Sequence, residues 1–369
     1  MTPTASCERV RSTDTADVWR TLAARTANIF STFEWGEAWW QHFGAGRERI
    51  TALCRDRDEA PIALLPLYVE RRGPVRFIRF IGDGAGGQVG PVCAPEDREQ
   101  AGKALLQFLD GFRGWDVFIG RAMPGSNGWS RVLGASVLNQ EPSPVVDLRG
   151  RDWDDFVSGR SKHFRRRVLN AKERLGRKHG LRYRLVTDPE ELPDALSALF
   201  DLHRRMRAGR PSSFLRLERF HRDFTQRALE NGWLRLWVLE LEDRPAGAVL
   251  DYVFGGVMAG YQLGMDPRWR RKMHIRLLIT NSIRAACNEG LKEYRLGKGG
   301  EEYKYQFADV DPGVESLVIG RGPVGRPLAS VLYRGRELRP TVRRLQRATE
   351  RLGRNNSRSR GSVPRSQRR

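Results

Sequence analysis

Apolar runs in the first part of the chain predict a small sheet and a helix. Three extended runs occupy residues 50–56, 61–72 and 75–81, and short polar turns separate them. Runs of aliphatic and aromatic residues bounded by turn residues are typical of strands, and the first two predict a hairpin. A helix is expected near 97–111, followed by a strand at 115–120.

A second series of strands follows in the later part of the chain. Residues 233–241, 245–254 and 257–264 form three apolar runs joined by the short turns Glu-Asp-Arg and Gly-Gly. A helix over about 272–289, a short strand, a loop and a last strand at 315–320 complete the series. A meander that feeds one helix and further strands favours an α+β fold over a doubly wound one.

Helical periodicity predicts three helices between these two series. The first is a basic helix over 152–180, and the last covers about 215–230. Between them, the helix from Leu192 to about Ala208 has leucines at steps of three and four residues, which place them on one face. Helices with such a stripe pack against a sheet or against each other.

The length and the punctuation of the chain predict two domains and a tail. At 369 residues the chain exceeds the usual size of one domain. A proline-containing stretch at 141–150 is typical of a boundary. We therefore expect units at 1–150 and 151–320, followed by a partly disordered Arg-rich tail at 321–369.

The positive charge is unevenly distributed. Of the formal net charge of +21, the last segment from Arg321 contributes +13, with fifteen arginines against two glutamates. Within the folded part, residues 160–184 carry eleven lysines and arginines against Glu173 alone. The helical part of this stretch is either a solvated face or a track for tRNA or an anionic lipid, and the tail is a second candidate for such contacts.

Cysteine usage and the N-terminus bear on compartment and metal binding. Cys7, Cys54, Cys93 and Cys287 stand far apart without a Cys-x-x-Cys pair, which indicates neither a zinc site nor a disulfide framework. No metal is expected. The first residues lack the apolar segment of a signal peptide, and no run approaches the length of a membrane span. A cytoplasmic protein is the default expectation.

The glycine-rich stretch Gly-Asp-Gly-Ala-Gly-Gly at 82–87 matches the spacing of a dinucleotide-binding loop. That motif requires a helix directly after the glycines, because the helix N-terminus receives the pyrophosphate. Here Gln-Val-Gly-Pro follows, which does not begin a helix. We interpret the stretch as a flexible loop.

The loop at 297–307, Gly-Lys-Gly-Gly-Glu-Glu-Tyr-Lys-Tyr-Gln-Phe, carries candidate catalytic groups after a strand end. It lacks the pattern of a P-loop. Glu301 or Glu302 is suited to deprotonate an attacking amine, Tyr303 to protonate a leaving group, and Lys304 to stabilise developing negative charge. The set suits acyl transfer, and the alternative is an ordinary turn with a surface lysine.

A basic cluster precedes the helix expected near 272. Arg270, Arg271, Lys272, His274 and Arg276 stand where unpaired backbone N–H groups and the helix dipole favour an anion. The cluster predicts a pyrophosphate site.

Three further residues are candidates for substrate binding. They are His203, Tyr261 and Asp266. For His203 the alternative is a structural histidine at the edge of the core.

Several of these motifs together resemble a known family. The strands at 233–264, Asp-Pro-x-Trp at Asp266–Trp269, and Gly-x-x-x-Tyr-Lys-x-x-Phe ending at Phe307 are similar to the acetyltransferase-like GNAT domain of CelD-type and BioF-associated proteins. The resemblance covers roughly 155–310. The helix starting at Ser161 also resembles a segment of FemABX peptidyltransferases, which contain two GNAT-like domains and use aminoacyl-tRNA. Residues 28–120 are compatible with a degenerate first half.

The resemblance implies a tandem GNAT-like fold with a mixed central sheet in each half. It also implies an acyltransferase that uses acetyl-CoA or another acyl-CoA, with a small-molecule or glycan acceptor, in cell-envelope or polysaccharide biosynthesis. One departure concerns the donor, because Ile275 replaces the glycine that usually permits close phosphate approach. Arginine side chains substitute for it, or the donor differs. The alternatives are FemABX-like transfer from aminoacyl-tRNA and a non-catalytic polyanion-binding protein.

Overall fold

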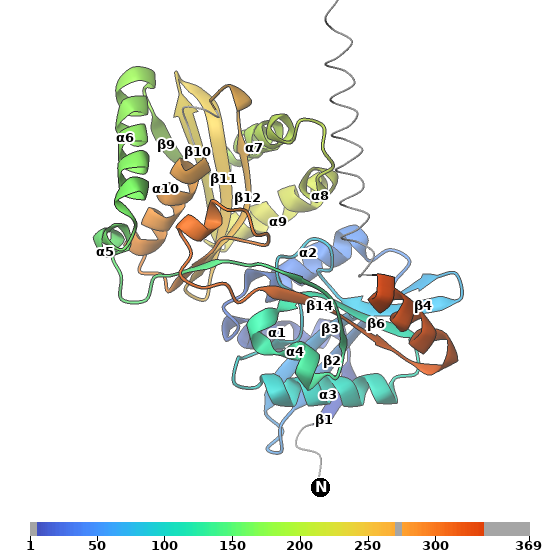
Figure 1. Ribbon diagram of the computed structural model, residues 1–369. Helices are drawn as coiled ribbons and strands as arrows, with labels where there is room; N and C mark the ends of the chain where they lie inside the picture. Colours follow the sequence, from blue (N-terminus) through green and yellow to red (C-terminus); the bar gives the residue numbers. More distant parts are fainter. Residues whose placement is uncertain (1–5, 270–274, 336–369) are drawn as a thin grey trace, which may run out of the picture.

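The computed structural model describes residues 6–269 and 275–335, which form two lobes, each built on one sheet (Figure 1). The Arg-rich tail from residue 336 onward lies outside the described residues. Residues 322–335 are helical, and Leu328 and Leu332 pack against the first lobe beside Val318. Short 3₁₀ helices are η1 (Ser12–Thr15), η2 (Ile29–Ser31), η3 (Gly125–Asn127), η4 (Pro267–Trp269) and η5 (Lys304–Gln306).

The sheet of the first lobe has the strand order β1-β2-β3-β4-β6-β14-β7, with β5 paired to β3. Its strands are β1 (Ser6–Val10), β2 (Glu48–Arg55), β3 (Pro61–Arg72), β4 (Val75–Phe80), β5 (Val92–Cys93), β6 (Val117–Pro124), β7 (Ser136–Glu141) and β14 (Val314–Gly320). Its helices are α1 (Ala16–Ala24), α2 (Phe33–Phe43), α3 (Arg98–Gly111) and α4 (Trp129–Val132).

The sheet of the second lobe has the order β8-β13-β12-β11-β10-β9. Its strands are β8 (Val145–Asp147), β9 (Arg182–Val186), β10 (Leu234–Leu241), β11 (Arg244–Phe254), β12 (Val257–Met265) and β13 (Glu293–Arg295). Its helices are α5 (Trp153–Ser158), α6 (Lys162–His179), α7 (Leu192–Arg207), α8 (Ser213–Arg216), α9 (Glu218–Glu230) and α10 (Ile275–Asn288).

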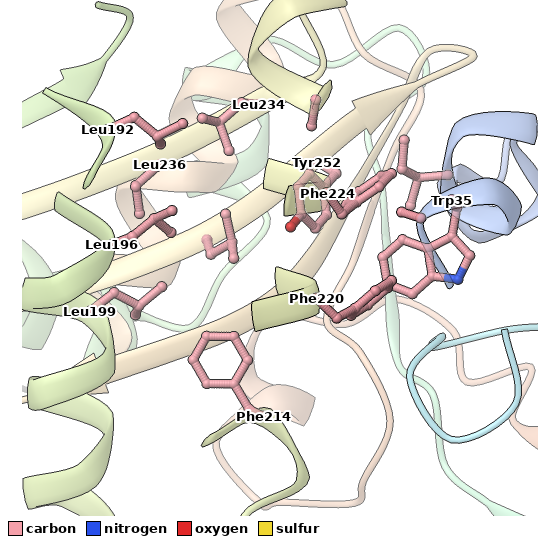
Figure 2. Close-up of a cluster of buried hydrophobic side chains, with 14 of the residues drawn as sticks. Trp35, Leu192, Leu196, Leu199, Phe214, Phe220, Phe224, Leu234, Leu236 and Tyr252 are labelled. Carbon is pink, nitrogen blue, oxygen red and sulfur yellow. The ribbon is translucent and has the colours of Figure 1, made fainter. Parts of the chain in front are cut away.

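The leucine stripe of α7 forms part of a core that both lobes share. Figure 2 shows Leu192, Leu196 and Leu199 pointing toward the side of the sheet that carries Leu234 and Leu236, as the periodicity predicts. Trp35 from α2 of the first lobe enters the same core, where its ring lies 4.6 Å from that of Phe224 of α9. The aromatic contact joins the lobes through buried apolar surface.

The basic helix expected over 152–180 is two helices. Asp152 begins α5 with a capping box, and Gly159 ends it. The Ser161 hydroxyl then accepts a hydrogen bond from the Phe164 N–H and begins α6, which Gly180 ends in a left-handed conformation. The helix end at Gly159 and the N-cap at Ser161 lie two residues apart and divide a stretch whose periodicity alone predicts one helix.

The two lobes exchange one strand each. β8 follows the first lobe in sequence but pairs with β13 of the second, whereas β14 follows the second lobe and pairs with β6 and β7 of the first. The sequence places boundaries near residues 150 and 320. In the structure, β8 lies before the first boundary but belongs to the second sheet, and β14 lies before the second boundary but belongs to the first sheet. Periodicity predicts that 315–320 is a strand, but it does not specify the partner of that strand.

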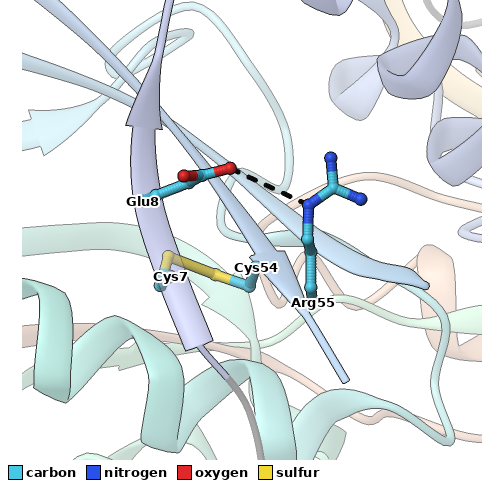
Figure 3. The surroundings of a disulfide bond; sticks show 4 residues. All are labelled: Cys7, Glu8, Cys54 and Arg55. Carbon is cyan, nitrogen blue, oxygen red and sulfur yellow. Dashed lines mark ion pairs between the residues drawn. A yellow bond between two sulfur atoms is a disulfide. The ribbon is translucent and has the colours of Figure 1, made fainter. Parts of the chain in front are cut away.

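A disulfide joins Cys7 of β1 to Cys54 of β2 (Figure 3). The expectation of no disulfide framework was wrong for this pair. Cys7 and Cys54 are 47 residues apart in sequence, but the antiparallel register places them directly opposite each other. Glu8 and Arg55 form an ion pair beside them at 3.8 Å.

Within the described parts of the chain, no helix has the length and apolar character that crossing a membrane requires.

Candidate functional site

The second sheet opens between its two parallel strands. β12 and β13 pair across three residue pairs only, from Val257 opposite Glu293 to Ala259 opposite Arg295. β13 then ends while β12 continues to Met265. A bulge adds to the opening, because Tyr261 has no partner on β11 where the register shifts. Bulges of this kind re-aim side chains and backbone groups near functional sites.

A cavity of about 290 Å³ occupies this opening. β11, β12, β13, α9 and α10 contribute to its wall, and so do Phe30 and the glycine-rich loop of the first lobe. The loop at 82–87, interpreted from the sequence as merely flexible, supplies Gly84, Ala85, Gly86 and Gly87 to the lining. The cavity is thus built by both lobes.

The cavity reaches both faces of the second sheet. Phe214 and Tyr261, which line it, belong to the core on the α7 and α9 side. Val249 and Tyr294, which also line it, belong to the core on the α10 side. Because alternate residues of a strand face opposite sides, Asp251 shares the α10 side with Val249. Two molecules entering from the two faces would meet in the gap.

Asp251 is fully buried in the cavity wall. The Tyr294 hydroxyl donates a hydrogen bond to its Oδ1 at 3.2 Å, and Oδ2 has no hydrogen-bond partner among the described residues. Burial raises the pKa of Asp251 to about 7, since a charged carboxylate is poorly solvated there, and the nearby Ser282 and Tyr294 hydroxyls offset only part of this rise. The carboxyl is therefore poised to exchange a proton near neutral pH.

His221 lies on the other side of the cavity. Burial, together with a smaller electrostatic effect of the nearby His42, lowers the pKa of His221 to about 3, so the His221 imidazole is neutral. Its Nδ1 lies 3.4 Å from the Tyr261 hydroxyl, and its Nε2 has no partner among the described residues. The Tyr261 hydroxyl donates to the Ala85 carbonyl at 3.0 Å, which ties β12 to the glycine-rich loop.

Lys304 lines the cavity but is engaged by its own loop. Its ammonium lies 3.1, 2.7 and 3.2 Å from the carbonyl oxygens of Gly297, Lys298 and Gly299, and 2.9 Å from a carboxylate oxygen of Glu301. These oxygens satisfy all three N–H groups of the buried ammonium. The structure thus gives Lys304 contacts that close the loop, and its catalytic role stays a prediction.

The other groups of that loop lie differently. Tyr303 lines the cavity, and burial raises the pKa of its hydroxyl, which stays protonated at neutral pH. Glu302 is exposed, and the side chain of Glu301 is 57% exposed beside Lys304. Of the predicted acid and base groups, Tyr303 is the one that faces the cavity.

Two predicted substrate-binding residues, His203 and Asp266, are not part of the cavity lining and have structural partners. His203 Nδ1 lies 2.7 Å from the Leu263 carbonyl, and its Nε2 lies 3.0 Å from the Ser212 hydroxyl. Asp266 accepts a hydrogen bond from Arg268 at 2.7 Å and forms an ion pair with Arg205 at 3.7 Å. The neighbouring arginines lower the pKa of Asp266. Tyr261 alone of the three lines the cavity.

The predicted pyrophosphate site falls mostly outside the described residues. Arg270, Arg271, Lys272 and His274 lie there, and the structure describes Arg276, the second residue of α10. The Arg276 Nε donates to the Gln306 side chain at 2.6 Å, which joins α10 to η5.

Sequence reasoning missed Asp251 and His221. A signal existed for Asp251, because it interrupts the otherwise apolar run 245–254 with an acid. Nothing in the spacing of His221 distinguishes it from the other histidines. Within residues 6–269 and 275–335, no group of three or more His, Cys, Asp or Glu side chains has the arrangement of a metal site.

Comparison with known proteins identifies the fold. Residues 162–305 match the family model described as acetyltransferase (GNAT) domain. The structure is similar to that of FemX, with a TM-score of 0.63 and 11% identity over 88% of this chain and 100% of that one. No curated protein sequence matches the chain.

Two other solved structures share the fold. The C-terminal domain of a putative lysylphosphatidylglycerol synthetase from Agrobacterium fabrum has a TM-score of 0.56 and 13% identity, over 89% of this chain and 97% of that one. The L-PGS of Bacillus licheniformis has a TM-score of 0.50 and 14% identity, over 81% and 95%. The protein therefore has an α+β GNAT-like fold with a mixed sheet in each half.

Proposed function

We propose that the protein is an acyltransferase that moves an acyl group from an activated donor, such as acetyl-CoA, to an amine or sugar acceptor. One observation carries the proposal: the cavity at the divergence of β12 and β13 reaches both faces of the sheet, so donor and acceptor have separate approaches to one point. The match of residues 162–305 to the acetyltransferase domain supports the same chemistry.

The backbone of β12 supplies the polar groups that such a reaction needs. Beyond Ala259, the edge of β12 that faces β13 has no ladder partner among the described strands. Its N–H groups are available to the acyl carbonyl oxygen, where negative charge develops during attack. Tyr303, protonated and facing the gap, is suited to give a proton to the leaving group.

The remaining assignments from the sequence are retained as parts of this proposal. Glu301 or Glu302 acts as a base if the loop brings its carboxylate toward the acceptor. Lys304 keeps its assignment as the group that stabilises developing negative charge, and we add that its contacts with the carbonyls of residues 297–299 hold Tyr303 next to the gap. The resemblance of the sequence motifs to CelD-type proteins suggests an acceptor from cell-envelope or polysaccharide biosynthesis.

The donor is the least determined reactant. The acyl end of a CoA thioester fits an opening lined by β12 backbone and by Tyr303. The phosphate end would rest near the start of α10, where Ile275 stands and where Arg276 is already bonded to Gln306. Charge reversal at Arg271 is expected to weaken donor binding with little change in stability, and unchanged affinity would move the anion site elsewhere.

A second candidate is transfer from aminoacyl-tRNA. Two observations favour it: the whole FemX chain is covered by the structural match, and α6 presents a basic surface. Lys162, Arg165, Arg166, Arg177 and Lys178 lie on this helix, where the described carboxylate is that of Glu173, paired with Arg177 at 3.3 Å. A non-catalytic polyanion-binding protein would use the same surface.

Calorimetric titrations separate these functions. The protein is titrated with acetyl-CoA and, separately, with tRNA, each at three salt concentrations. Binding of acetyl-CoA with a shallow salt dependence supports the first function. Binding of tRNA alone, with a steep dependence, supports the others, because each phosphate contact releases counterions. Absence of acetyl-CoA binding would overturn the use of acetyl-CoA as donor.

A further inference from the structure

A second cavity, of about 400 Å³, lies between the lobes beside the first one. Residues of η2, α3 and α4 of the first lobe line it, and so do Val145 of β8 and Arg295 of β13 in the second sheet. Asn28, Gln88 and Arg295 line both cavities, so the two adjoin each other. A molecule in the second cavity therefore lies next to the opening between β12 and β13.

The guanidinium of Arg98 brings an uncompensated positive charge to the second cavity. Arg98 is the first residue of α3, and its side chain is half-buried in the cavity wall. It forms no hydrogen bond or ion pair with any residue that the structure describes. Burial lowers the pKa of Arg98, and no carboxylate acts against this shift. Because a charge that is partly removed from water destabilises a protein unless it is paired, the position favours an anion.

The acids that adjoin Arg98 in sequence, and the acid of the cavity wall, are paired with other cations. Arg25 lies 3.0 Å from a carboxylate oxygen of Glu96 and 3.0 Å from one of Asp97. The other two pairs are Glu99 with Lys103 at 2.7 Å and Glu293 with Arg295 at 3.2 Å. Among the described residues, none of these acids is left for Arg98. A ligand that brings its own anion would complete this part of the wall.

Neutral hydrogen-bonding groups make up much of the remaining wall. Five side chains there carry hydroxyl or amide groups: Thr26, Asn28, Ser31, Gln88 and Ser126. The Asn28 Nδ2 donates to the Ser31 hydroxyl at 2.9 Å and to the Gln88 carbonyl at 3.1 Å, which fixes this part of the wall. The side-chain amide of Gln88 is half-buried and has no hydrogen-bond partner within the described ranges. Groups of this kind are suited to the hydroxyls of a sugar.

The cavity is preformed and carries no free negative charge of its own near Arg98. Prolines at 91, 95, 124 and 312 line it, and the ring of each fixes one backbone dihedral. Burial raises the pKa of the Cys93 thiol, which also lines the cavity, to about 12, so this thiol is neutral. A wall that is already in place loses little freedom when a ligand enters.

We propose that the second cavity binds a sugar that carries a carboxylate or a phosphate group, with Arg98 on the anion and Gln88 on a hydroxyl. A guanidinium offers parallel N–H groups to either anion, so the two kinds of sugar share one chemistry of recognition.

The position of this site identifies the sugar as the acyl acceptor. Arg98 lines the second cavity alone, whereas Gln88 and Arg295 line both, so a sugar anchored at Arg98 extends toward the opening between β12 and β13. This part of the inference rests on the proposed acyl transfer and narrows its acceptor from an amine or sugar to an anionic sugar.

Titrations with glucuronate and with glucose 6-phosphate, and with glucose as the neutral counterpart, test the site without any acyl donor. Calorimetry is carried out on the full chain, on Arg98→Gln, and on Arg113→Gln, which removes an exposed arginine outside the cavity lining. The wild type and Arg113→Gln are expected to bind at least one anionic sugar about tenfold or more tightly than glucose, and Arg98→Gln to lose this preference.

The same titrations distinguish the two anions and can overturn the site. Tighter binding of glucuronate identifies a carboxylate as the anion, and tighter binding of glucose 6-phosphate identifies a phosphate. Arg98→Lys should keep part of the preference, because it retains the charge but not the planar fork of N–H groups. Equal affinity for the anionic sugars in Arg98→Gln and wild type, or a wild type that does not prefer them to glucose, would overturn the proposal.

The wild type alone provides a second test that does not depend on folding of a variant. Inorganic phosphate, added at constant ionic strength, should compete with the anionic sugars for Arg98 and weaken their binding. Affinity for the anionic sugars that is unaffected by phosphate contradicts the role of Arg98.

The sugar test and the donor test can fail separately. Sugar binding that depends on Arg98, without binding of acetyl-CoA or aminoacyl-tRNA, supports the sugar site and overturns acyl transfer. Donor binding without preference for an anionic sugar leaves acyl transfer standing and overturns the sugar site.

Discussion

In the first lobe the parallel strands β4 and β6 pair through three residue pairs, and in the second lobe β12 and β13 do the same. The first lobe fills the gap beyond this pairing with its own chain. The Val89 N–H, from the segment that follows β4, donates to the Ala122 carbonyl of β6. In the second lobe the gap remains open as the cavity.

The buried acids in the two lobes also differ in their partners. Asp83 in the first lobe is compensated by Arg79 and lies near Arg121 at 3.8 Å. Asp251 in the second lobe has an unpartnered oxygen. The same strand arrangement is thus closed in the first lobe and forms a cavity in the second. The first lobe also contributes its loop at 82–87 to the wall of that cavity.

The largest expected effect concerns the closed gap. Asp83→Ala removes the partner of a buried arginine, whose side chain is 5% exposed, and should lower the free energy of unfolding by about 3 kcal/mol. Urea denaturation measures the difference. A loss below about 1 kcal/mol would show that the ion pair does not hold the first lobe closed.

Lys304→Met should affect both stability and activity. The substitution leaves the carbonyls of residues 297–299 without their donor, which should lower the free energy of unfolding by about 2 kcal/mol. Turnover should fall about 10²-fold once a substrate is known, because Tyr303 loses its fixed position. Lys304→Arg should restore part of each, since the guanidinium differs in shape. Full activity in Lys304→Met would make the loop purely structural.

Asp251→Asn should raise the free energy of unfolding near pH 8, whereas Asp83→Ala should lower it. The folded-state pKa of Asp251, about 7, lies above the ordinary value of 3.8, so the folded protein retains a proton that the unfolded chain releases. Stability of the wild type therefore falls as pH rises from about 4 to about 7, and the variant should lack this component. Near pH 8 we expect the variant to be more stable by about 1 kcal/mol. Urea denaturation of the wild type and the variant at several pH values measures this difference. A variant that is less stable than the wild type near pH 8 would indicate that Asp251 stabilises the fold.

Tyr261→Phe should have the smallest effect. It removes the hydrogen bond from the Tyr261 hydroxyl to the Ala85 carbonyl, worth about 1 kcal/mol. Amide exchange in the loop at 82–87 should become faster, because the tie between the lobes is weakened. Unchanged exchange would show that packing against Trp35 and Val89 alone holds the loop.

Elements with strong periodicity could be predicted from the sequence, and contacts set by pairing could not. The stripe of α7 and the strands at 233–264 needed only local patterns. The exchange of β8 and β14, and the disulfide of Cys7 and Cys54, depend on which strands become neighbours. A short strand carries little information about its partner, since many apolar runs fit the same edge.

The site could be predicted only in part, because some of its groups follow from local motifs and others depend on tertiary contacts. Tyr261 and Tyr303 lie in the cavity, and the loop motif located that region of the sheet. The contacts of Lys304 with three carbonyls arise from the folding of its loop, which its sequence alone does not specify. Asp251 becomes notable only when burial and the absence of a partner for Oδ2 are known.

A crystal structure of the protein soaked with CoA tests the central claim most directly. The account predicts that the thiol end of CoA lies between β12 and β13. CoA bound between β4 and β6 of the first lobe, or away from both gaps, would contradict it.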